Sequence, residues 1–249
     1  DAVSRIDESK DKVNWNDFCL WKARKPNEPF WESELGEGRP GWHIEDTAIT
    51  ETVFGPQYDI HGAAIDLIFP HHEAEIAQME AASGLKPFVR HWLHAGFLNI
   101  DSKKMAKSTG NFKIIREALK NYNYQILRFF FLSAHYRATL DFSEEGLIQA
   151  KGALHRINEF LFNLDPDYED LNEQETVANL RNEVYQWLDN DFDTPRAFAA
   201  IFDFIRSENT KGHKTGRYSY EFFQELNKIF DIFTLQQGLV EEIILQLIE

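Results

Sequence analysis

The stretch YDIHGAAIDLIFPHHEAE, residues 58–75, decides the fold of this chain because its pattern changes halfway along. Its start predicts a strand over Tyr58–His61, and its end predicts a helix over Pro70–Ala82, whose proline and carboxylates suit a helix N-terminus. The flanking patterns predict another helix over His43–Phe54 and another strand near Trp92–Gly96. Helices that alternate with short strands predict an α/β domain with a parallel sheet.

The rest of the chain follows different patterns. Residues 1–40 are punctuated by proline and glycine and predict a long loop packed onto the α/β domain. From Ile114 onward, apolar residues recur at helical spacing without strand-like alternation, which predicts a helical bundle with loops at Asp165–Glu175 and Ser207–Tyr218. The predicted fold class is therefore α/β followed by all-α.

Length and composition exclude several classes of protein. The 249 residues favour two domains, and a hydrophobic content of 43% excludes a disordered tail and a coiled-coil rod. No apolar run approaches the roughly 18 residues of a membrane span, so we expect no membrane partner. The single cysteine, Cys19, allows no internal disulfide and fits a cytoplasmic location. The first residues do not resemble a signal peptide, and we expect a piece of a longer protein.

Charge is distributed unevenly along the chain. The net charge is −15, yet residues 86–120 hold eight basic and two acidic residues, whereas residues 165–191 hold nine acidic residues and one basic. A basic island in an acidic chain indicates a local anionic ligand, although charge alone is equally typical of a solvated face.

A turn of small residues, HGAA at 61–64, follows the first predicted strand. Small residues let a ligand approach the backbone closely at the carboxyl ends of strands, where α/β sheets bind their ligands. Asp66 is a candidate acceptor for the hydroxyl groups of a ribose. An aspartate that merely shapes a turn or a helix entry is the alternative interpretation.

His71 and Glu75 are candidate metal ligands, because residues four apart lie on one helical face and can both reach one Zn²⁺ ion. The alternative is an ordinary polar pair on an exposed helix. Asp46 is the nearest further donor, and Cys19 is another, although its apolar neighbours favour a small buried hydrophobe. The adjacent His72 and Glu73 are expected to point elsewhere, as supporting residues or surface residues.

The segment KKMAKSTGN, residues 103–111, combines lysines with small and hydroxylated residues. Such a loop can close on phosphates and donate hydrogen bonds as charge develops, so Lys104 and Lys107 are candidate catalytic residues. A plain basic turn at the surface is the alternative.

Three motifs, in this order and spacing, resemble the cysteinyl-tRNA synthetase family: GRPGWHIE at 38–45, the stretch from Asp59 to Gln78, and KMAKS at 104–108. The last is similar to the KMSKS loop of class I synthetases, with Ala106 in place of a serine. The segment DFDTPRA, residues 191–197, is similar to the signature of the DALR-like helical domain of that family. The resemblance runs over nearly the whole chain.

The resemblance implies both a fold and an activity. The fold would be the C-terminal half of a Rossmann-type catalytic domain over residues 1–115, a stem-contact region over residues 116–145 and a helical tRNA-binding bundle over residues 146–249. The activity would be activation of L-cysteine with ATP and Mg²⁺, followed by transfer of the cysteine to tRNA(Cys). Zinc would select the substrate thiolate, because the hydroxyl of serine is a poor zinc ligand.

The resemblance also implies roles for individual residues. His71 and Glu75 would bind zinc, with Asp46 at a position where the family usually has a cysteine ligand. Trp42 would contact the substrate cysteine. The resemblance implies contacts with ATP or the adenylate for five residues: Ala64, Ile65, Asp66, Lys107 and Ser108. It implies a catalytic role for Lys104 and Lys107.

Two departures from the family pattern matter. Asp46 replaces a thiolate with a harder carboxylate, which ligates zinc but is expected to weaken the site. The HIGH motif of class I synthetases does not occur in the sequence, so we expect the chain to be catalytically incomplete alone. The alternatives are a related ATP-dependent cysteine ligase of thiol biosynthesis, which needs no tRNA, and a non-catalytic paralogue.

Overall fold

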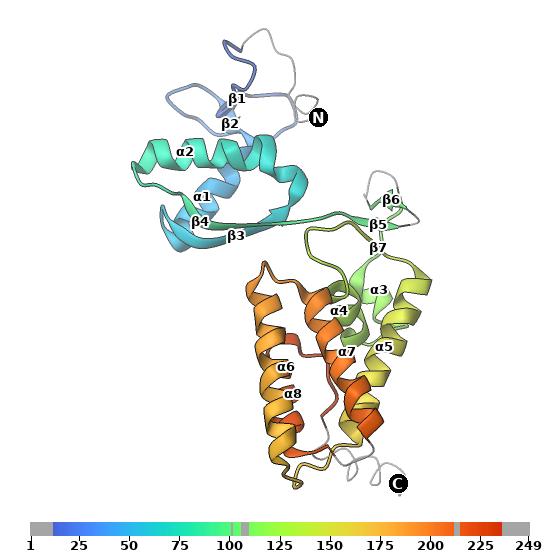
Figure 1. Cartoon of the computed structure of the whole chain (residues 1–249). Coiled ribbons are helices and arrows are strands. Elements are labelled where there is room, and N and C mark those ends of the chain that lie inside the picture. Colours follow the sequence, from blue (N-terminus) through green and yellow to red (C-terminus); the bar gives the residue numbers. More distant parts are fainter. Residues whose placement is uncertain (1–11, 101, 106–109, 212–214, 236–249) are drawn as a thin grey trace, which may run out of the picture. The chain divides into compact units, whose positions relative to one another are not determined.

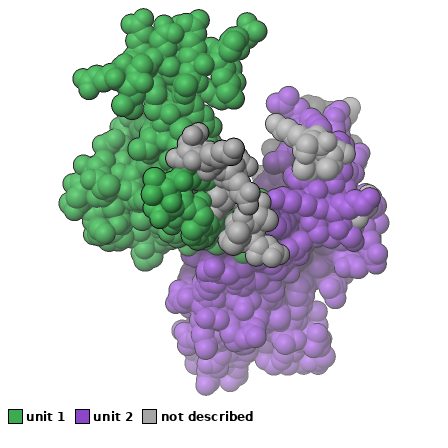
Figure 2. Space-filling model, turned by 90° about the horizontal axis from the view of Figure 1, so that it is seen from above, with its two compact units in different colours: residues 1–96 green, residues 97–249 purple. Residues whose placement is uncertain are grey.

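The computed structural model describes residues 12–100, 102–105, 110–211 and 215–235. The chain divides into two compact units, unit 1 over residues 1–96 and unit 2 over residues 97–249 (Figure 2). Unit 1 mixes helices with strands, and unit 2 is helical apart from one small sheet, which confirms the predicted order of α/β followed by all-α. None of the helices in the described ranges is long and apolar enough to cross a membrane.

Unit 1 places two helices beside a pair of parallel strands (Figure 1). Its elements are β1 (Trp21–Ala23), β2 (Gly38–Pro40), α1 (Trp42–Phe54), β3 (Tyr58–Ala64), α2 (Glu73–Ser83) and β4 (Val89–Ala95). β3 and β4 pair in parallel, as the sequence predicts, and α2 lies in the crossover between them. Their register sets His61 opposite Trp92 and Ala63 opposite His94.

The structure corrects three predictions in unit 1. β4 begins at Val89 rather than near Trp92, and α2 begins at Glu73 rather than at Pro70. A 3₁₀ turn (Ile65–Leu67) and a π turn (Ile68–His72) precede α2, because Phe69 has extended backbone angles that interrupt the helix. The expected loop over residues 1–40 contains the antiparallel pair β1–β2 among its described residues.

Gly41 joins this strand pair to α1. Its N–H donates to the carbonyl of Leu20 at 2.8 Å, and a Cβ atom at this position would lie 1.8 Å from the carbonyl oxygen of Cys19. Only glycine permits this close approach of two backbone segments. The approach fixes where α1 begins, and α1 carries part of the site described below.

Unit 2 consists of a three-stranded sheet and a helical bundle (Figure 1). The strands are β5 (Leu98–Ile100), β6 (Lys103–Lys104) and β7 (Leu140–Asp141), in the order β6-β5-β7. The helices are α3 (Ile115–Ala118), α4 (Tyr124–Leu132), α5 (Glu144–Phe162), α6 (Leu171–Asp189), α7 (Thr194–Lys211) and α8 (Arg217–Phe230). β7 is a strand where the sequence predicts helices only; at two residues, it is too short to give an alternating pattern.

The core of unit 2 lies between its long helices. On α5 the buried apolar residues recur every three or four positions, which forms one continuous stripe. Residues of α5, α7 and α8 with no exposed surface meet in this core, among them Ile157, Ile201 and Phe223. Side-chain caps fix where helices begin: Ser143 accepts a hydrogen bond from the N–H of Gly146, and Asp170 accepts one from Asn172.

The loops of unit 2 are shorter than predicted. The acidic segment Asp165–Glu175 becomes helical from Leu171, because Asp170 caps α6 and the carboxylates that follow suit a helix N-terminus. The polar segment Ser207–Tyr218 is helical up to Lys211 and again from Arg217. The family-based division at residues 115 and 145 stays a prediction, and the boundary between the compact units lies at Gly96.

Phe223 and Phe162 offer a matched test of this core. Both are helical phenylalanines of unit 2, but Phe223 is fully buried whereas 62% of Phe162 is exposed. We expect Phe223→Ala to lower the free energy of unfolding by about 3–5 kcal/mol, since it leaves a cavity, and Phe162→Ala to change it by less than about 1 kcal/mol. Urea denaturation of both variants measures the difference, and equal losses would contradict the assigned core.

Candidate metal centre

Helix α1 brings three polar or aromatic side chains to one end of unit 1. Trp42 and Asp46 are four residues apart, so they lie on the same helical face, and His43 lies beside Trp42. The indole of Trp42 stacks on the imidazole of His71, with 4.6 Å between the ring centroids. Trp42 also stacks on His43, with 5.6 Å between the ring centroids, and 54% of it is exposed.

His71 lies at the centre of this group. Its Nε2 is 2.8 Å from Oδ2 of Asp46 and 2.9 Å from Oε1 of Glu75, and its Nδ1 is 2.7 Å from Nδ1 of His43. The structure thus brings together the three residues that the sequence singled out as candidate metal ligands. One ring nitrogen facing two carboxylates is an arrangement in which a single cation can bind all three groups.

Glu75 shows most clearly that this group fits a cation. Only 1% of the side chain is exposed; Oε1 faces Nε2 of His71, and Oε2 has no hydrogen-bond partner among the described residues. Burial first, and then the nearby negative charge of Asp46, raise the pKa of Glu75 to about 7. A buried carboxylate without hydrogen bonds is costly unless a positive charge neutralises it. Two carboxylates and an imidazole are ligands that Zn²⁺ accepts.

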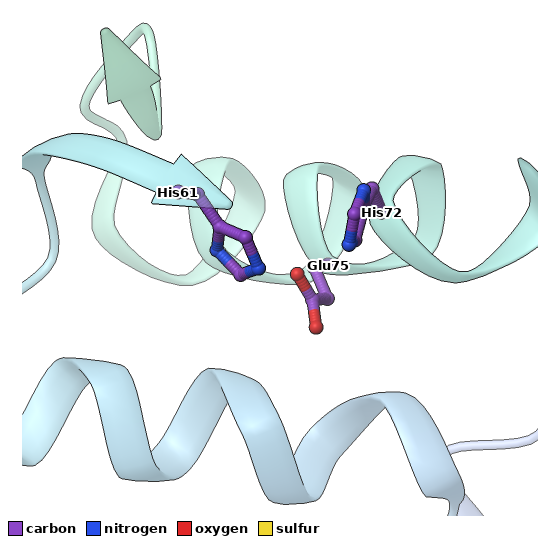
Figure 3. A group of neighbouring side chains, drawn as sticks. All are labelled: His61, His72 and Glu75. Atoms are coloured by element: carbon purple, nitrogen blue, oxygen red, sulfur yellow. The ribbon is translucent and has the colours of Figure 1, made fainter. Parts of the chain in front are cut away.

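A second group of histidines lies beside Glu75. His61 extends from β3, His72 from the π turn and His94 from β4. Nδ1 of His72 is 2.8 Å from Nε2 of His94, and Nδ1 of His61 is 2.5 Å from the hydroxyl of Tyr58. Figure 3 shows His61, His72 and Glu75 converging. Burial first, then the neighbouring His61 and His94, lower the pKa of His72 to about 4.

The sequence analysis missed this second group. His72 was expected to point elsewhere, as a supporting or surface residue; only 3% of it is exposed, which excludes the surface, and it packs against His61 and His94. A signal existed in the strands, because parallel pairing of HGAA with WLHA sets their histidines near one another.

The other candidate residues lie in different places. Ala64 ends β3, and Ile65 and Asp66 form the 3₁₀ turn that follows. Lys104 belongs to β6 of unit 2, where its Nζ lies 3.9 Å from the ring centroid of Phe97. Lys107 and Ser108 lie outside the described residues.

Cys19 takes no part in either group of possible ligands within the described residues. Its thiol lies 3.1 Å from the carbonyl oxygen of Trp21, and its side chain is exposed rather than buried as its neighbours suggested. The apolar neighbours predicted a buried cysteine, but Leu20 and Trp21 are themselves only partly buried or exposed.

Comparison with known proteins identifies the family. The model of the class I (C) tRNA synthetase catalytic domain matches residues 1–152, which is more than half of the chain. The chain belongs to this family. The model of the DALR domain matches residues 183–235, within the helical part of unit 2. The expected fold, a class I synthetase catalytic domain followed by a DALR domain, is confirmed.

Curated relatives are similar over most of the chain. A cysteine--tRNA ligase of Carboxydothermus hydrogenoformans is 42% identical over 97% of this chain and 54% of its own length. Cysteine--tRNA ligases of a Geobacter species and of Thermococcus onnurineus are 48% and 43% identical, over 84% and 92% of this chain. The chain spans about half the length of these relatives.

A solved structure with a similar fold is the leucyl synthetase of Agrobacterium radiobacter K84, titled as a ternary complex with tRNA and LeuAMS. It matches 74% of this chain and 29% of its own chain, with a TM-score of 0.56 and 14% sequence identity. This likeness supports the class I fold.

Glu75→Gln tests the proposed role of this carboxylate. We expect zinc binding to weaken by about 100-fold or more, because loss of residues that only support metal ligands already costs about 10–100-fold. The metal-free variant should unfold at the same or a higher urea concentration, since it no longer buries a charged carboxylate one of whose oxygens has no hydrogen-bond partner.

Glu73→Gln is the matched control, because Glu73 is exposed on the same helix two residues away. Isothermal titration with Zn²⁺ and urea denaturation measure both effects. Unchanged zinc affinity in Glu75→Gln would contradict a ligand role.

Proposed function

We propose that this chain is part of an enzyme that activates L-cysteine with ATP and transfers it to tRNA(Cys), the reaction named by its curated relatives. The observation that carries the proposal is the convergence of Asp46, His71 and the buried Glu75. Since the chain spans about half of those relatives, the proposed activity is that of the whole protein.

We propose Zn²⁺ as the ion bound by Asp46, His71 and Glu75. Zinc supplies selectivity, because a soft thiolate coordinates it strongly and a hydroxyl does not. This solves a problem that packing alone leaves open, since cysteine and serine have nearly the same size. With three protein ligands, a position remains for the substrate sulfur, as in catalytic zinc sites.

Trp42 is proposed to form the wall of the cysteine pocket. It stacks on His71 and is 54% exposed. An indole held against a metal ligand can orient a small side chain that binds the same metal, and it also fixes the ring plane of His71.

ATP is proposed to bind where β3 ends. Ala64 and Ile65 carry small or apolar side chains that permit contact with the adenylate, and Asp66 offers a carboxylate to the ribose. Lys104, Lys107 and Ser108 are proposed to contact the phosphates, with Mg²⁺ bound to the nucleotide. Their positive charge and hydrogen-bond donors suit the charge that develops during adenylate formation.

tRNA is the proposed partner of unit 2. The basic stretch of residues 86–120 suits phosphate groups, and the match to the DALR domain favours a tRNA ligase over a cysteine ligase that needs no tRNA. For an enzyme of protein synthesis, the proposed location is the cytoplasm.

Cobalt binding tests the proposed cysteine site on the chain itself. Co²⁺ replaces zinc and gives a charge-transfer band when a thiolate binds it. We use Cys19→Ser, so that the added substrate supplies the only thiol. We expect a thiolate–cobalt band on addition of L-cysteine and none with L-serine, and His71→Ala should abolish the band.

His91→Ala is the control, because His91 is an exposed histidine of the same unit. Its cobalt spectrum should match that of the Cys19→Ser chain. A band of equal strength in His71→Ala, or no band with cysteine in any variant, would contradict the proposal.

A further inference from the structure

We propose that unit 1 contains a second position for a divalent cation, formed by His61, His72 and Glu75. This group differs from Asp46, His71 and Glu75 in two of its three ligands, and Glu75 belongs to both. In each group one ligand atom per residue lies within 4.8 Å of the others. Glu75 is therefore the residue through which two cations would be linked.

The two imidazoles are already oriented as metal ligands usually are. A metal-binding histidine normally uses one ring nitrogen for the metal while the other is held by a hydrogen-bond partner. Here Nδ1 of His61 is held by the hydroxyl of Tyr58, and Nδ1 of His72 is held by His94. This leaves Nε2 of each ring as the atom available to a cation.

Two of the three residues have a buried polar atom with no hydrogen-bond partner among the described residues. Nε2 of His72 is buried without a hydrogen-bond partner in the described part of the chain, and so is Oε2 of Glu75, whose Oε1 faces His71. His72 and Glu75 are 97% and 99% buried. Unpaired polar atoms of this kind are costly, and two of them facing the same point indicate a missing positively charged ligand.

Trp92 supports both rings. The ring centroids of His61 and His72 lie 4.7 Å and 4.8 Å from that of the Trp92 indole. Packing of this kind fixes the ring planes, which reduces the entropy lost when a cation binds. Figure 3 shows the carboxylate of Glu75 between the two imidazoles.

The ligand types indicate the class of ion and the order of binding. Two imidazoles and one carboxylate suit Zn²⁺ or a similar transition metal and not Mg²⁺ or Ca²⁺, which prefer oxygen ligands. The group with Asp46 carries two carboxylates, so it attracts the first cation more strongly. The group with His61 and His72 must share Glu75 with that first ion and binds the second cation more weakly.

The number of bound ions tests this proposal. The chain is freed of metal, and cobalt binding is measured by equilibrium dialysis with metal analysis in a Cys19→Ser background. We expect two ions per chain, the second with an affinity at least about tenfold lower. His61→Gln and His72→Gln should each retain one tight ion, whereas His91→Gln, at an exposed histidine of β4, should retain two.

A single ion in the parent chain overturns the proposal, and so do two ions that persist in both His61→Gln and His72→Gln. His61 is only partly buried, so His61→Gln carries the test if circular dichroism shows that His72→Gln does not fold. Paramagnetic resonance of the parent chain needs no variant. Ions that share Glu75 couple, so the signal of the first cobalt ion should weaken as the second binds, and a simply additive signal contradicts the proposal.

The second position is separable from the proposed cysteine chemistry. Discrimination of cysteine from serine needs only the ion at Asp46, His71 and Glu75. A thiolate–cobalt band at one bound ion, without a second binding step, would therefore support the proposed function and reject this inference.

Discussion

The buried carboxylate of Glu75 is the constraint on which the site depends. It lies in α2, belongs both to the group with Asp46 and His71 and to the group with His61 and His72, and one of its oxygens, Oε2, has no hydrogen-bond partner in the part of the chain that the structure describes. An unfolded chain would keep such a group in water at no cost. A bound cation can offset the free energy lost by burying this carboxylate. The neighbouring elements are arranged so that their side chains can serve as the other ligands of that cation.

The rest of unit 1 positions those ligands. Gly41 lets the strand pair β1–β2 approach the start of α1, which sets the direction of Trp42 and Asp46. The parallel pairing of β3 with β4 supplies His61 and His94 from adjacent strands. α1 and β3 thus bring Asp46 and His61 to the carboxylate of Glu75, and β4 brings His94 to His72. In unit 2, the apolar core between the helices stabilises the fold. Hydrogen bonds from backbone N–H groups to the side chains of Ser143 and Asp170 fix where two of the helices begin.

Sequence patterns predicted as much of the fold as their periodicity allows. Helical spacing along α5 and the alternation of helices with short strands gave the class and the order of the two parts, because both follow from which residues must be buried. β7 and the β1–β2 pair could not be predicted, since two- and three-residue strands carry no period. The first group of ligands was predictable because His71 and Glu75 are one helical turn apart. The group with His61 and His72 was not, because it depends on which strands pair and which helix packs beside them, and His61 and His72 carry no fixed spacing in the sequence.

X-ray absorption at the zinc edge of the zinc-loaded chain tests most directly whether Asp46, His71 and Glu75 hold an ion that selects sulfur. Before substrate is added, we expect only nitrogen and oxygen neighbours at about 2.0–2.2 Å, because Cys19 lies outside both groups of ligands. After addition of L-cysteine, and not of L-serine, a sulfur neighbour should appear at about 2.3 Å. Sulfur present before cysteine is added, or a zinc environment that cysteine leaves unchanged, would contradict this interpretation of the site.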